Sequence, residues 1–302
     1  MVAVPPRADV KVGFACNNRC LFCAQGDKRS ECPTLPLDEL IARLRAARER
    51  GEGLVLTGGE PTVHKQIAEL IAAAKALGFH PIQIQTNGRL LAYPQFLASL
   101  IAAGATEFSP SLHGSTAAIH DELTQAPGSF DQTVAGLKNL ARARARVVTN
   151  SVITRQNLDD LPALVALLAS LGVRTAQLAF VHAVGTAADN LDQMMPRFSD
   201  AVPAIAAARQ VARRAGVRLY TEAIPLCFLS GMEDLAVEEI IPQMTVLDLD
   251  GAVRDFSAWR SAEGKLHGPP CEACAARPRC EGPWREYPAH FGWSEFVPIP
   301  LP

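Results

Sequence analysis

Apolar and polar residues follow two periodicities in turn along the first 220 residues, and these predict alternating strands and helices. Short apolar runs with β-branched residues predict strands, and apolar positions three or four residues apart predict helices. The predicted strands cover residues 10–15, 55–56, 81–86, 106–112, 146–153 and 174–181. The predicted helices cover residues 37–50, 63–77, 94–103, 129–145, 158–171 and 198–215, and most are followed by a glycine that ends the helix.

Six strand–helix units in succession predict an α/β fold with a parallel sheet and right-handed crossovers. Eight units would close a barrel, so six predict an incomplete one. Ligands of such folds bind at the carboxyl ends of the strands. Polar or glycine residues stand at these predicted ends, and they are Gly58, Gly59, Glu60, Thr86, Asn87, Ser109, Ser111, His113, Asn150 and Ser151.

The pattern changes at about residue 217. A short predicted strand over residues 217–222 is followed by a predicted hairpin over residues 244–256, with Asp250-Gly251 as its turn. Cysteines are concentrated after the hairpin. We therefore expect a boundary near residue 220, with one domain over residues 1–220 and a small cysteine-rich domain over residues 221–302.

Composition narrows the class of protein. The chain has 302 residues, a net charge of −2 and 48% hydrophobic residues, which suits one large domain or one and a half. Near-neutral charge gives no electrostatic basis for binding nucleic acid or an anionic membrane. No apolar run reaches the roughly 18 residues of a membrane span, and the N-terminus lacks a secretory signal. We expect a cytoplasmic protein whose eight cysteines stay reduced.

Three of these cysteines, Cys16, Cys20 and Cys23, form a C-x3-C-x2-C motif. Three thiolates so close in sequence are typical ligands of an iron–sulfur cluster, and a cubane would keep one iron free for another ligand. A zinc site would normally show paired C-x2-C motifs and a fourth ligand. Disulfides are not expected in a long chain without a secretory signal. The spacing favours a cluster, and we expect the nearby Cys32 to be a loop thiol.

The predicted strand over residues 55–56 leads into Gly58-Gly59-Glu60-Pro61. Together, the cysteine motif and this turn resemble the radical S-adenosylmethionine (SAM) enzymes, over about residues 10–225. The resemblance implies a partial (βα)6 TIM-like barrel, a [4Fe-4S] cluster on the three cysteines, and SAM bound to its fourth iron. In that family the reduced cluster cleaves SAM to methionine and a 5′-deoxyadenosyl radical, which abstracts a hydrogen atom from the substrate. An electron donor such as a flavodoxin or ferredoxin is the implied partner.

The resemblance also implies contacts to SAM around the two motifs. Phe22 occupies the aromatic position before the third cysteine, where the family packs the SAM adenine. Gly58 and Gly59 let the backbone approach a ligand closely, and would meet the SAM amino group. Glu60 occupies the position of the family's usual anchor there.

Further candidates for SAM contacts follow the later strands. Ser109, Ser111 and Asn150 are candidates for the SAM ribose and carboxylate, although Ser and Asn are also common at strand ends as helix caps. Arg155 is a candidate partner of the SAM carboxylate, with a solvated arginine as the alternative. We expect His113 to be a structural histidine, with substrate contact or proton transfer as the alternatives. No catalytic side chain is assigned.

The C-terminal cysteines resemble the auxiliary-cluster domain of the SPASM/twitch subgroup, in which a hairpin and a short helix carry cysteines around a second [4Fe-4S] cluster. Full SPASM domains carry more cysteines, so the shorter twitch type fits better. A four-cysteine zinc site is the alternative. We expect the three tryptophans of this region, Trp284 among them, to form its core. The predicted ligands of the second cluster are Cys227, Cys271, Cys274 and Cys280.

The resemblance implies radical chemistry but leaves the substrate open. We expect modification of a ribosomally made peptide or protein, by crosslinking or epimerisation. Oxidation or cyclisation of a small metabolite is the alternative. Because the cluster motif begins at residue 16, we expect no fused leader-binding domain, so a peptide substrate would call for a separate leader-binding protein. A non-catalytic SAM-binding iron–sulfur or zinc scaffold is a third hypothesis, and the intact cysteine motif and Gly58-Gly59-Glu60 argue against it.

Overall fold

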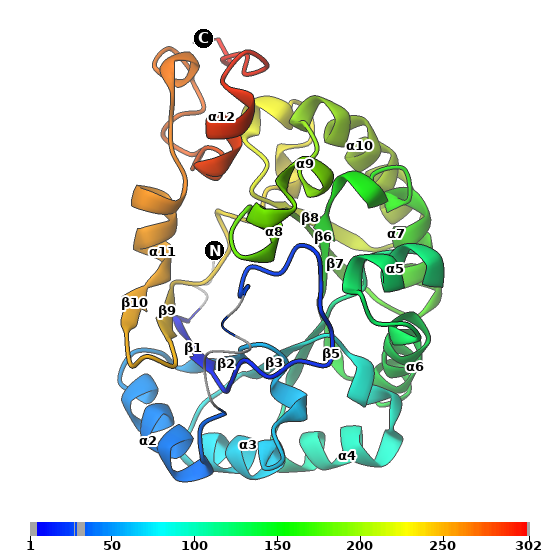
Figure 1. The fold of residues 1–302 in the computed structure, drawn as a ribbon, viewed down its shortest axis with the longest axis vertical. Coiled ribbons are helices and arrows are strands. Elements are labelled where there is room, and N and C mark those ends of the chain that lie inside the picture. The colour runs from blue at the N-terminus through cyan, green and yellow to red at the C-terminus, as the bar shows by residue number, and fades with distance from the viewer. Residues whose placement is uncertain (1–4, 27, 29–33, 301–302) are drawn as a thin grey trace.

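Parallel strands line the inside of the fold and helices form an arc around them (Figure 1). The structure, a computed structural model, describes residues 5–26, 28 and 34–300, so Cys32 lies outside the described residues. The strands of the barrel are β1 (Arg7–Lys11), β2 (Gly53–Thr57), β3 (Ile82–Thr86), β4 (Glu107–Pro110), β5 (Arg146–Val147), β6 (Thr149–Ile153), β7 (Thr175–Phe180) and β8 (Arg218–Glu222). This arrangement confirms the predicted α/β partial TIM-like barrel.

The outer helices agree closely with the hydrophobic pattern. The predicted helices over residues 94–103 and 198–215 have the observed bounds, and glycines end both. The helix predicted from residue 63 begins at Ile67, because Pro61–Val63 form a separate 3-10 turn. The outer helices are α2 (Leu37–Arg48), α3 (Ile67–Ala76), α4 (Pro94–Ala103), α5 (Ala117–Thr124), α6 (Ser129–Arg142), α7 (Leu161–Ser170) and α10 (Phe198–Ala215).

Within residues 113–197, three short helices were not predicted from the pattern. These are α5, α8 (Thr186–Asp189) and α9 (Leu191–Met194). Helix α5 has a local signal, since the Thr116 side chain accepts a hydrogen bond from the Ile119 N–H as an N-cap. Helices α8 and α9 are single turns, too short for a helical periodicity to appear.

The region predicted as one strand over residues 146–153 is divided in two. Strand β5 pairs with β4, whereas β6 pairs with β7, and an isolated bridge between Ser111 and Asn150 spans the break. The barrel therefore consists of a seven-stranded sheet in the order β10-β9-β1-β2-β3-β4-β5 and a three-stranded sheet in the order β6-β7-β8.

The predicted hairpin joins the barrel. Strands β9 (Met244–Leu247) and β10 (Val253–Asp255) are antiparallel, as predicted, but β9 also pairs in parallel with β1, over residues 7–10. The predicted boundary near residue 220 falls inside β8, which pairs with β7. The first and last parts of the chain therefore share one sheet.

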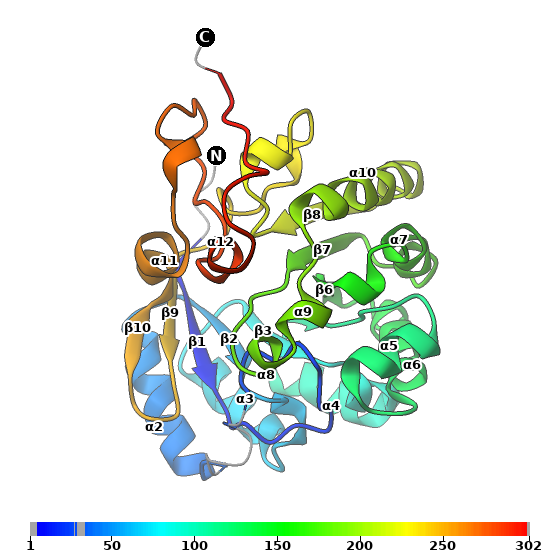
Figure 2. The same ribbon diagram turned by 45° about the horizontal axis from the view of Figure 1, so that its top comes forward.

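Aromatic packing joins the C-terminal segment to the barrel. In Figure 2 this segment, coloured orange to red, lies beside β9 and includes α11 (Phe256–Trp259) and α12 (Glu286–Phe291). The fully buried Tyr287 ring stacks on Phe198 of α10 at 4.0 Å between centroids, and Phe296 contacts both edge-on. Aromatic contacts of this kind form a common core.

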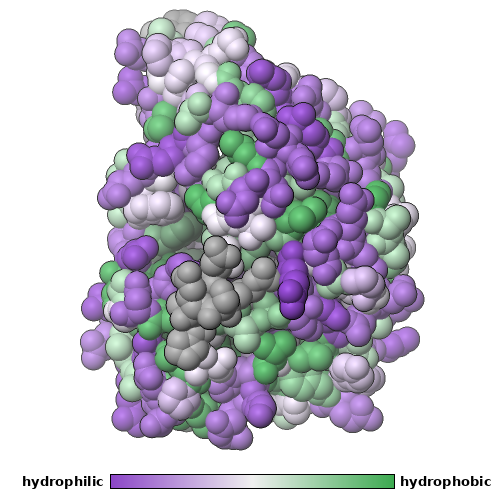
Figure 3. Space-filling view, in the orientation of Figure 1, coloured by the Kyte–Doolittle hydropathy of each residue, from purple (hydrophilic) through white to green (hydrophobic). Residues whose placement is uncertain are grey.

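Hydrophobic residues are scattered among hydrophilic ones on the face shown in Figure 3. The large hydrophobic side chains that are exposed lie apart in the sequence, and they are Tyr93, Ile101, Ile240, Val253 and Val297. Among the helices of the described residues, none combines the length and apolar character that crossing a membrane requires.

Candidate functional site

A central cavity of about 340 Å³ lies at the carboxyl ends of the barrel strands. Its volume is within the roughly 300–1,000 Å³ of small-molecule sites. The predicted site residues that line it are Cys16, Cys20, Phe22, Cys23, Gly58, Gly59 and Ser111. The other main polar and aromatic lining residues are Lys11, Asn18, Thr57, Gln85, Thr86, Asn87, His113, Phe180, His182, Glu222 and Trp284.

The Gly58-Gly59 turn packs directly against the segment that leads into the cysteines. The Gly59 and Glu60 N–H groups donate to the carbonyl oxygens of Gly13 and Ala15, at 2.8 and 2.9 Å. A Cβ atom at Gly58 would overlap the Gly13 carbonyl oxygen, and one at Gly59 would lie 2.6 Å from the Ala15 carbonyl oxygen. Glycine is therefore required at both positions because the backbone of residues 13–15 leaves no room for a Cβ atom. Close approach of these glycines to a ligand remains a prediction.

The Glu60 side chain braces this turn. Its buried carboxylate accepts hydrogen bonds from the Thr62 N–H (3.0 Å), the Thr86 hydroxyl (2.6 Å) and the Asn87 N–H (2.5 Å). Burial raises its pKa above the ordinary value, and these hydrogen bonds partly offset that rise. The carboxylate thus links the end of β3 to the turn after β2, and Glu60 is not among the lining residues of the central cavity. Its predicted contact with SAM stays a prediction.

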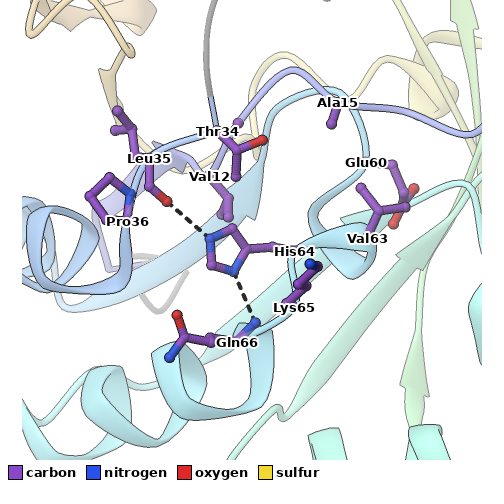
Figure 4. Close-up of a pocket in the computed structure, with 11 residues that line it drawn as sticks. Val12, Ala15, Thr34, Leu35, Pro36, Glu60, Val63, His64, Lys65 and Gln66 are labelled. Atoms are coloured by element: carbon purple, nitrogen blue, oxygen red, sulfur yellow. Dashed lines mark hydrogen bonds between the residues drawn. The ribbon is translucent and has the colours of Figure 1, made fainter.

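A second cavity lies on the outer side of the same turn (Figure 4). His64 connects its two walls, because Nε2 donates to the Leu35 carbonyl oxygen (3.1 Å) and Nδ1 accepts from the Gln66 N–H (3.2 Å). Thr34 and Pro36 complete the wall on the Leu35 side. His64 thereby fixes the start of α2 against the start of α3.

Phe22 and His113 form one aromatic wall of the central cavity. Their rings meet edge-on at 4.6 Å, and both residues are buried. Nδ1 of His113 accepts from the Val152 N–H (3.1 Å), while the His113 N–H donates to Nδ1 of His120 (3.0 Å). The expected structural role of His113 agrees with these bonds, and its ring also faces the cavity.

The stability of the protein is expected to fall as pH is lowered from 7 towards 4. Burial lowers the pKa of His120 to about 4 and that of His113 well below its usual value. Both titrate near 6.5 when unfolded, so below that pH the unfolded chain binds more protons than the folded one. For His120 alone the loss reaches about 3 kcal/mol at pH 4.

Urea unfolding at a series of pH values measures this dependence. His120→Asn keeps an acceptor for the His113 N–H. In this variant the loss of unfolding free energy between pH 7 and pH 4 should be smaller by about 3 kcal/mol. The exposed His80→Gln is the control and should follow the wild type. An unchanged pH dependence in His120→Asn would show that His120 is not held neutral by the fold.

The later candidate SAM contacts are placed differently from one another. Ser111 lines the cavity, whereas Ser109, buried on β4, does not. Asn150 lies two residues before Val152, a lining residue, and therefore shares its side of β6. Arg155 is exposed and donates to the Met195 carbonyl oxygen (3.0 Å), away from the lining residues. The structure thus brings Ser111 to the cavity and gives Arg155 another partner.

The C-terminal cysteines gather around a small separate cavity. Backbone N–H groups point at two of their sulfur atoms, from Leu226 and Gly282 to Cys280 (3.5 and 3.4 Å) and from Ile299 to Cys274 (3.3 Å). Among the described residues no group of three or more His, Cys, Asp or Glu side chains could hold a single metal ion. A [4Fe-4S] cluster has a different requirement, one thiolate for each iron. The cysteines that line this cavity are Cys227, Cys271, Cys274 and Cys280.

Residues 280–284 form part of both cavities. Cys280 lines the C-terminal one, and Trp284, four residues later, lines the central one. Four residues span at most about 14 Å between Cα atoms. Trp284 is buried, as expected for a core residue, but it also faces the central cavity. The two cavities are therefore neighbours.

Several lining residues were not predicted from the sequence. Thr57, Gln85 and Glu222 stand at or near the ends of β2, β3 and β8, so the rule that strand ends carry the site could have identified them. Glu222 in particular ends the predicted strand over residues 217–222. His182 follows β7, and Trp284 comes from the C-terminal segment, for which the barrel pattern gives no signal.

Sequence relatives of the chain have been assigned several activities. It is 29% identical over 184 residues to a protein named probable GTP 3′,8-cyclase of Saccharolobus solfataricus, an alignment that covers 60% of this chain and 59% of that protein. It is also 29% identical over 184 residues to the AdoMet-dependent heme synthase of Methanosarcina barkeri, covering 60% of this chain and 52% of that protein. The chain thus spans little more than half the length of these relatives.

Solved structures share the fold. SuiB of Streptococcus suis bound to S-adenosylmethionine matches 88% of this chain and 63% of that one, with a TM-score of 0.67 and 16% identity. The anSMEcpe structure with bound AdoMet and Kp18Cys peptide matches 83% of this chain and 74% of that one, with a TM-score of 0.60 and 14% identity. The family model of the radical SAM superfamily matches residues 10–168, which include the cysteine motif and the Gly58-Gly59 turn. The chain belongs to the radical SAM superfamily.

Proposed function

We propose that this radical SAM enzyme modifies a ribosomally made peptide or protein, by crosslinking or epimerisation, and holds a second [4Fe-4S] cluster of the SPASM/twitch type. The observation that carries the proposal is the shared wall formed by residues 280–284, between the central cavity and the cavity of four cysteines. A redox centre there would lie beside the place where a substrate is held. An electron donor such as a flavodoxin or ferredoxin would be the redox partner.

The central cavity fits the first cluster and SAM. Cys16, Cys20 and Cys23 line one cavity, and the Asn18 N–H donates to the Cys16 sulfur atom (3.4 Å), as a thiolate ligand favours. Asn150 is not itself a lining residue, but its Oδ1 is buried and lacks a hydrogen-bond partner among the described residues, so it could accept a hydrogen bond from a hydroxyl of a ligand that reaches it. When bound, the cluster and SAM supply a radical that abstracts a hydrogen atom. The cysteines would hold the cluster, and Phe22 would pack against the adenine.

The C-terminal cavity fits a second cluster in number and type of ligand. Four cysteines supply one thiolate to each iron, and three backbone N–H groups donate to their sulfur atoms. Such hydrogen bonds stabilise thiolates and set the reduction potential of a cluster. Structural zinc with four cysteines is the competing occupant, and it would need a different arrangement of these side chains, because as described they form no group that could hold a single ion. With zinc the site would stabilise the segment without accepting electrons.

Two kinds of substrate have support from similar proteins. SuiB has been solved bound to precursor peptide SuiA, and this match covers 88% of the chain, well beyond the residues of the family model. This favours a peptide, with a separate leader-binding protein as a further partner. The sequence relatives named GTP 3′,8-cyclase and heme synthase favour oxidation or cyclisation of a small metabolite as the second candidate. A non-catalytic SAM-binding scaffold is the third.

One preparation of anaerobically reconstituted protein tests these functions. About eight irons and eight sulfides per chain are expected, and about four irons with one zinc would reject the second cluster. Formation of 5′-deoxyadenosine is then measured with peptide and small-molecule fractions of a cell extract. Stimulation that a protease destroys supports the peptide, and stimulation that survives the protease supports the metabolite. No 5′-deoxyadenosine under any condition would support the scaffold.

Replacing Cys274 with alanine should separate SAM cleavage from product formation. Cys274 lines only the C-terminal cavity, so the thiolates of the central cavity remain. We expect about four irons to be lost per chain, while SAM cleavage continues without coupling to product. Iron content and the ratio of 5′-deoxyadenosine to product measure both effects. Full coupling in the variant would reduce the C-terminal site to a structural role.

A further inference from the structure

Residues from β7, β8 and the C-terminal segment form one side of the central cavity, which we call the β7–β8 wall. It consists of Ala179, Phe180, His182, Glu222 and Trp284. Glu222 is its acidic member and the last residue of β8. The Gln177 side chain of β7 donates to Oε2 of Glu222 at 2.5 Å. This bond fixes the carboxylate on the side of the sheet that faces the cavity.

The basic residues behind this wall already have other partners. Nζ of Lys265 lies 2.9 Å from Glu238 and 2.9 Å from Glu281, and its side chain is fully buried. Arg260 donates through Nε and Nη2 to both oxygens of Glu281, at 2.9 and 2.8 Å. Within the described part of the chain, no basic nitrogen forms an ion pair with Glu222. Two cations thus face three carboxylates, and the unpaired carboxylate is the one at the cavity.

The Trp284 ring of the wall already has two partners. His182 stacks on Trp284 at 3.9 Å between centroids, and Nζ of Lys265 lies over the Trp284 ring at 5.2 Å. Trp284 is therefore already engaged in stacking and in a cation–π contact within the protein. Recognition at this wall is then a matter of charge and hydrogen bonding at Glu222, not of stacking.

We propose that Glu222 anchors the substrate by binding a positively charged nitrogen group, an ammonium or a guanidinium. The proposal rests on the proposed function in one respect, that the central cavity is where the substrate binds. A bound cation would form an ion pair with the Glu222 carboxylate, which has no cationic partner of its own. It would also form charge-assisted hydrogen bonds to this carboxylate. A lysine or arginine side chain of a peptide, or an amine of a metabolite, carries this chemistry.

The electrostatics of the β7–β8 wall agree with this role. Burial raises the pKa of Glu222, and the neighbouring Glu238 raises it further, while Lys265 and Arg260 act in the opposite direction and Glu281 adds to the rise. A carboxyl group in these surroundings is costly to ionise without a partner. A bound cation stabilises the ionised form of Glu222. A neutral or acidic group does not, so the site should bind a cation more tightly than either.

Fluorine NMR of full-length, anaerobically reconstituted protein labelled with 5-fluorotryptophan tests this. The signal of Trp284 is assigned with Trp284→Phe, and the probes are butylamine and butyrate. We expect butylamine to shift the Trp284 signal saturably and butyrate to leave it unchanged. Glu222→Gln should weaken butylamine binding roughly tenfold or more, and Glu222→Asp should restore part of it. Glu239→Gln removes an exposed carboxylate that pairs with Arg279 and does not line the cavity, and this variant should bind as the wild type does.

A second pair of probes distinguishes the sources of the cation. A short capped peptide with one lysine is compared with butylamine. If the peptide binds more tightly and Glu222→Gln abolishes this binding, the cation is a side chain of a peptide. Equal shifts by butyrate and butylamine, or no shift by either, would overturn the anchor, and this comparison needs only the wild type. The measurement uses neither SAM cleavage nor product, so a protein that forms no 5′-deoxyadenosine can still show the anchor.

Discussion

Replacing Cys23 with alanine is expected to abolish reductive cleavage of SAM. Cys23 is one of three cysteines that line the central cavity, and its backbone also holds the loop, since its carbonyl oxygen accepts from the N–H groups of Gly26 and Thr186. A cluster bound to the protein through three thiolates is not held by two. Formation of 5′-deoxyadenosine with dithionite as reductant should fall to background, and about four irons per chain should be lost.

Cys274→Ala is the matched control for this experiment. It removes one thiolate from the other cavity and should cost a similar amount of iron, yet SAM cleavage should continue. Comparing the two variants separates loss of a particular cluster from general loss of iron. SAM cleavage retained in Cys23→Ala would contradict the assignment of the first site.

Gly58→Ala is expected to lower the free energy of unfolding by roughly 3 kcal/mol or more. Gly58 has φ of +140°, a conformation that alanine adopts only with strain, and its Cβ would overlap the Gly13 carbonyl oxygen. That oxygen cannot move freely, because it accepts the hydrogen bond from the Gly59 N–H. The strain is therefore passed to the segment that leads into Cys16, and the iron content should fall with the stability.

Gly216→Ala separates the two causes of this effect. Gly216 also has a positive φ, +66°, but a Cβ there would meet nothing within 4 Å. Its replacement should cost only about 1 kcal/mol, from backbone conformation alone. Urea unfolding and iron content of both variants give the comparison. Similar losses in the two would mean that the contact between the glycine turn and the cysteine segment adds no stability.

The sequence predicted the local elements better than their partners. Helix α10 has its predicted bounds because its apolar positions repeat at helical spacing up to Gly216. The Asp250-Gly251 turn likewise indicated the hairpin correctly. Pairing of β9 with β1 could not be predicted, since hydrogen bonds between distant strands leave no periodic signal in either. For the same reason, the predicted strand over residues 146–153 gave no sign that its two halves pair with different neighbours.

The residues of the candidate site that belong to a sequence motif could be predicted. Residues whose place in the cavity depends on the direction of the side chain were predicted less well. The cysteine motif and Gly58-Gly59 line the cavity as a set. Ser109 lies on an expected strand and Arg155 follows one, but position near a strand end does not determine where a side chain points. Trp284 was not predicted as a lining residue because it lies in the C-terminal segment, outside the strand–helix pattern of the barrel. Long-range packing, which the sequence pattern does not reveal, completes this cavity.

The pairing of β9 with β1 also governs when the first site can be completed during synthesis. Strand β1 precedes both of its partners in the sequence, and its partner β2 is made well before its other partner β9. Until then one edge of β1 has no partner strand. Because β1 leads directly into the cysteine segment, that segment stays attached to a half-paired strand until residues 244–247 have been made. We therefore expect the metal centre to be completed only after the β9–β10 hairpin has been synthesised.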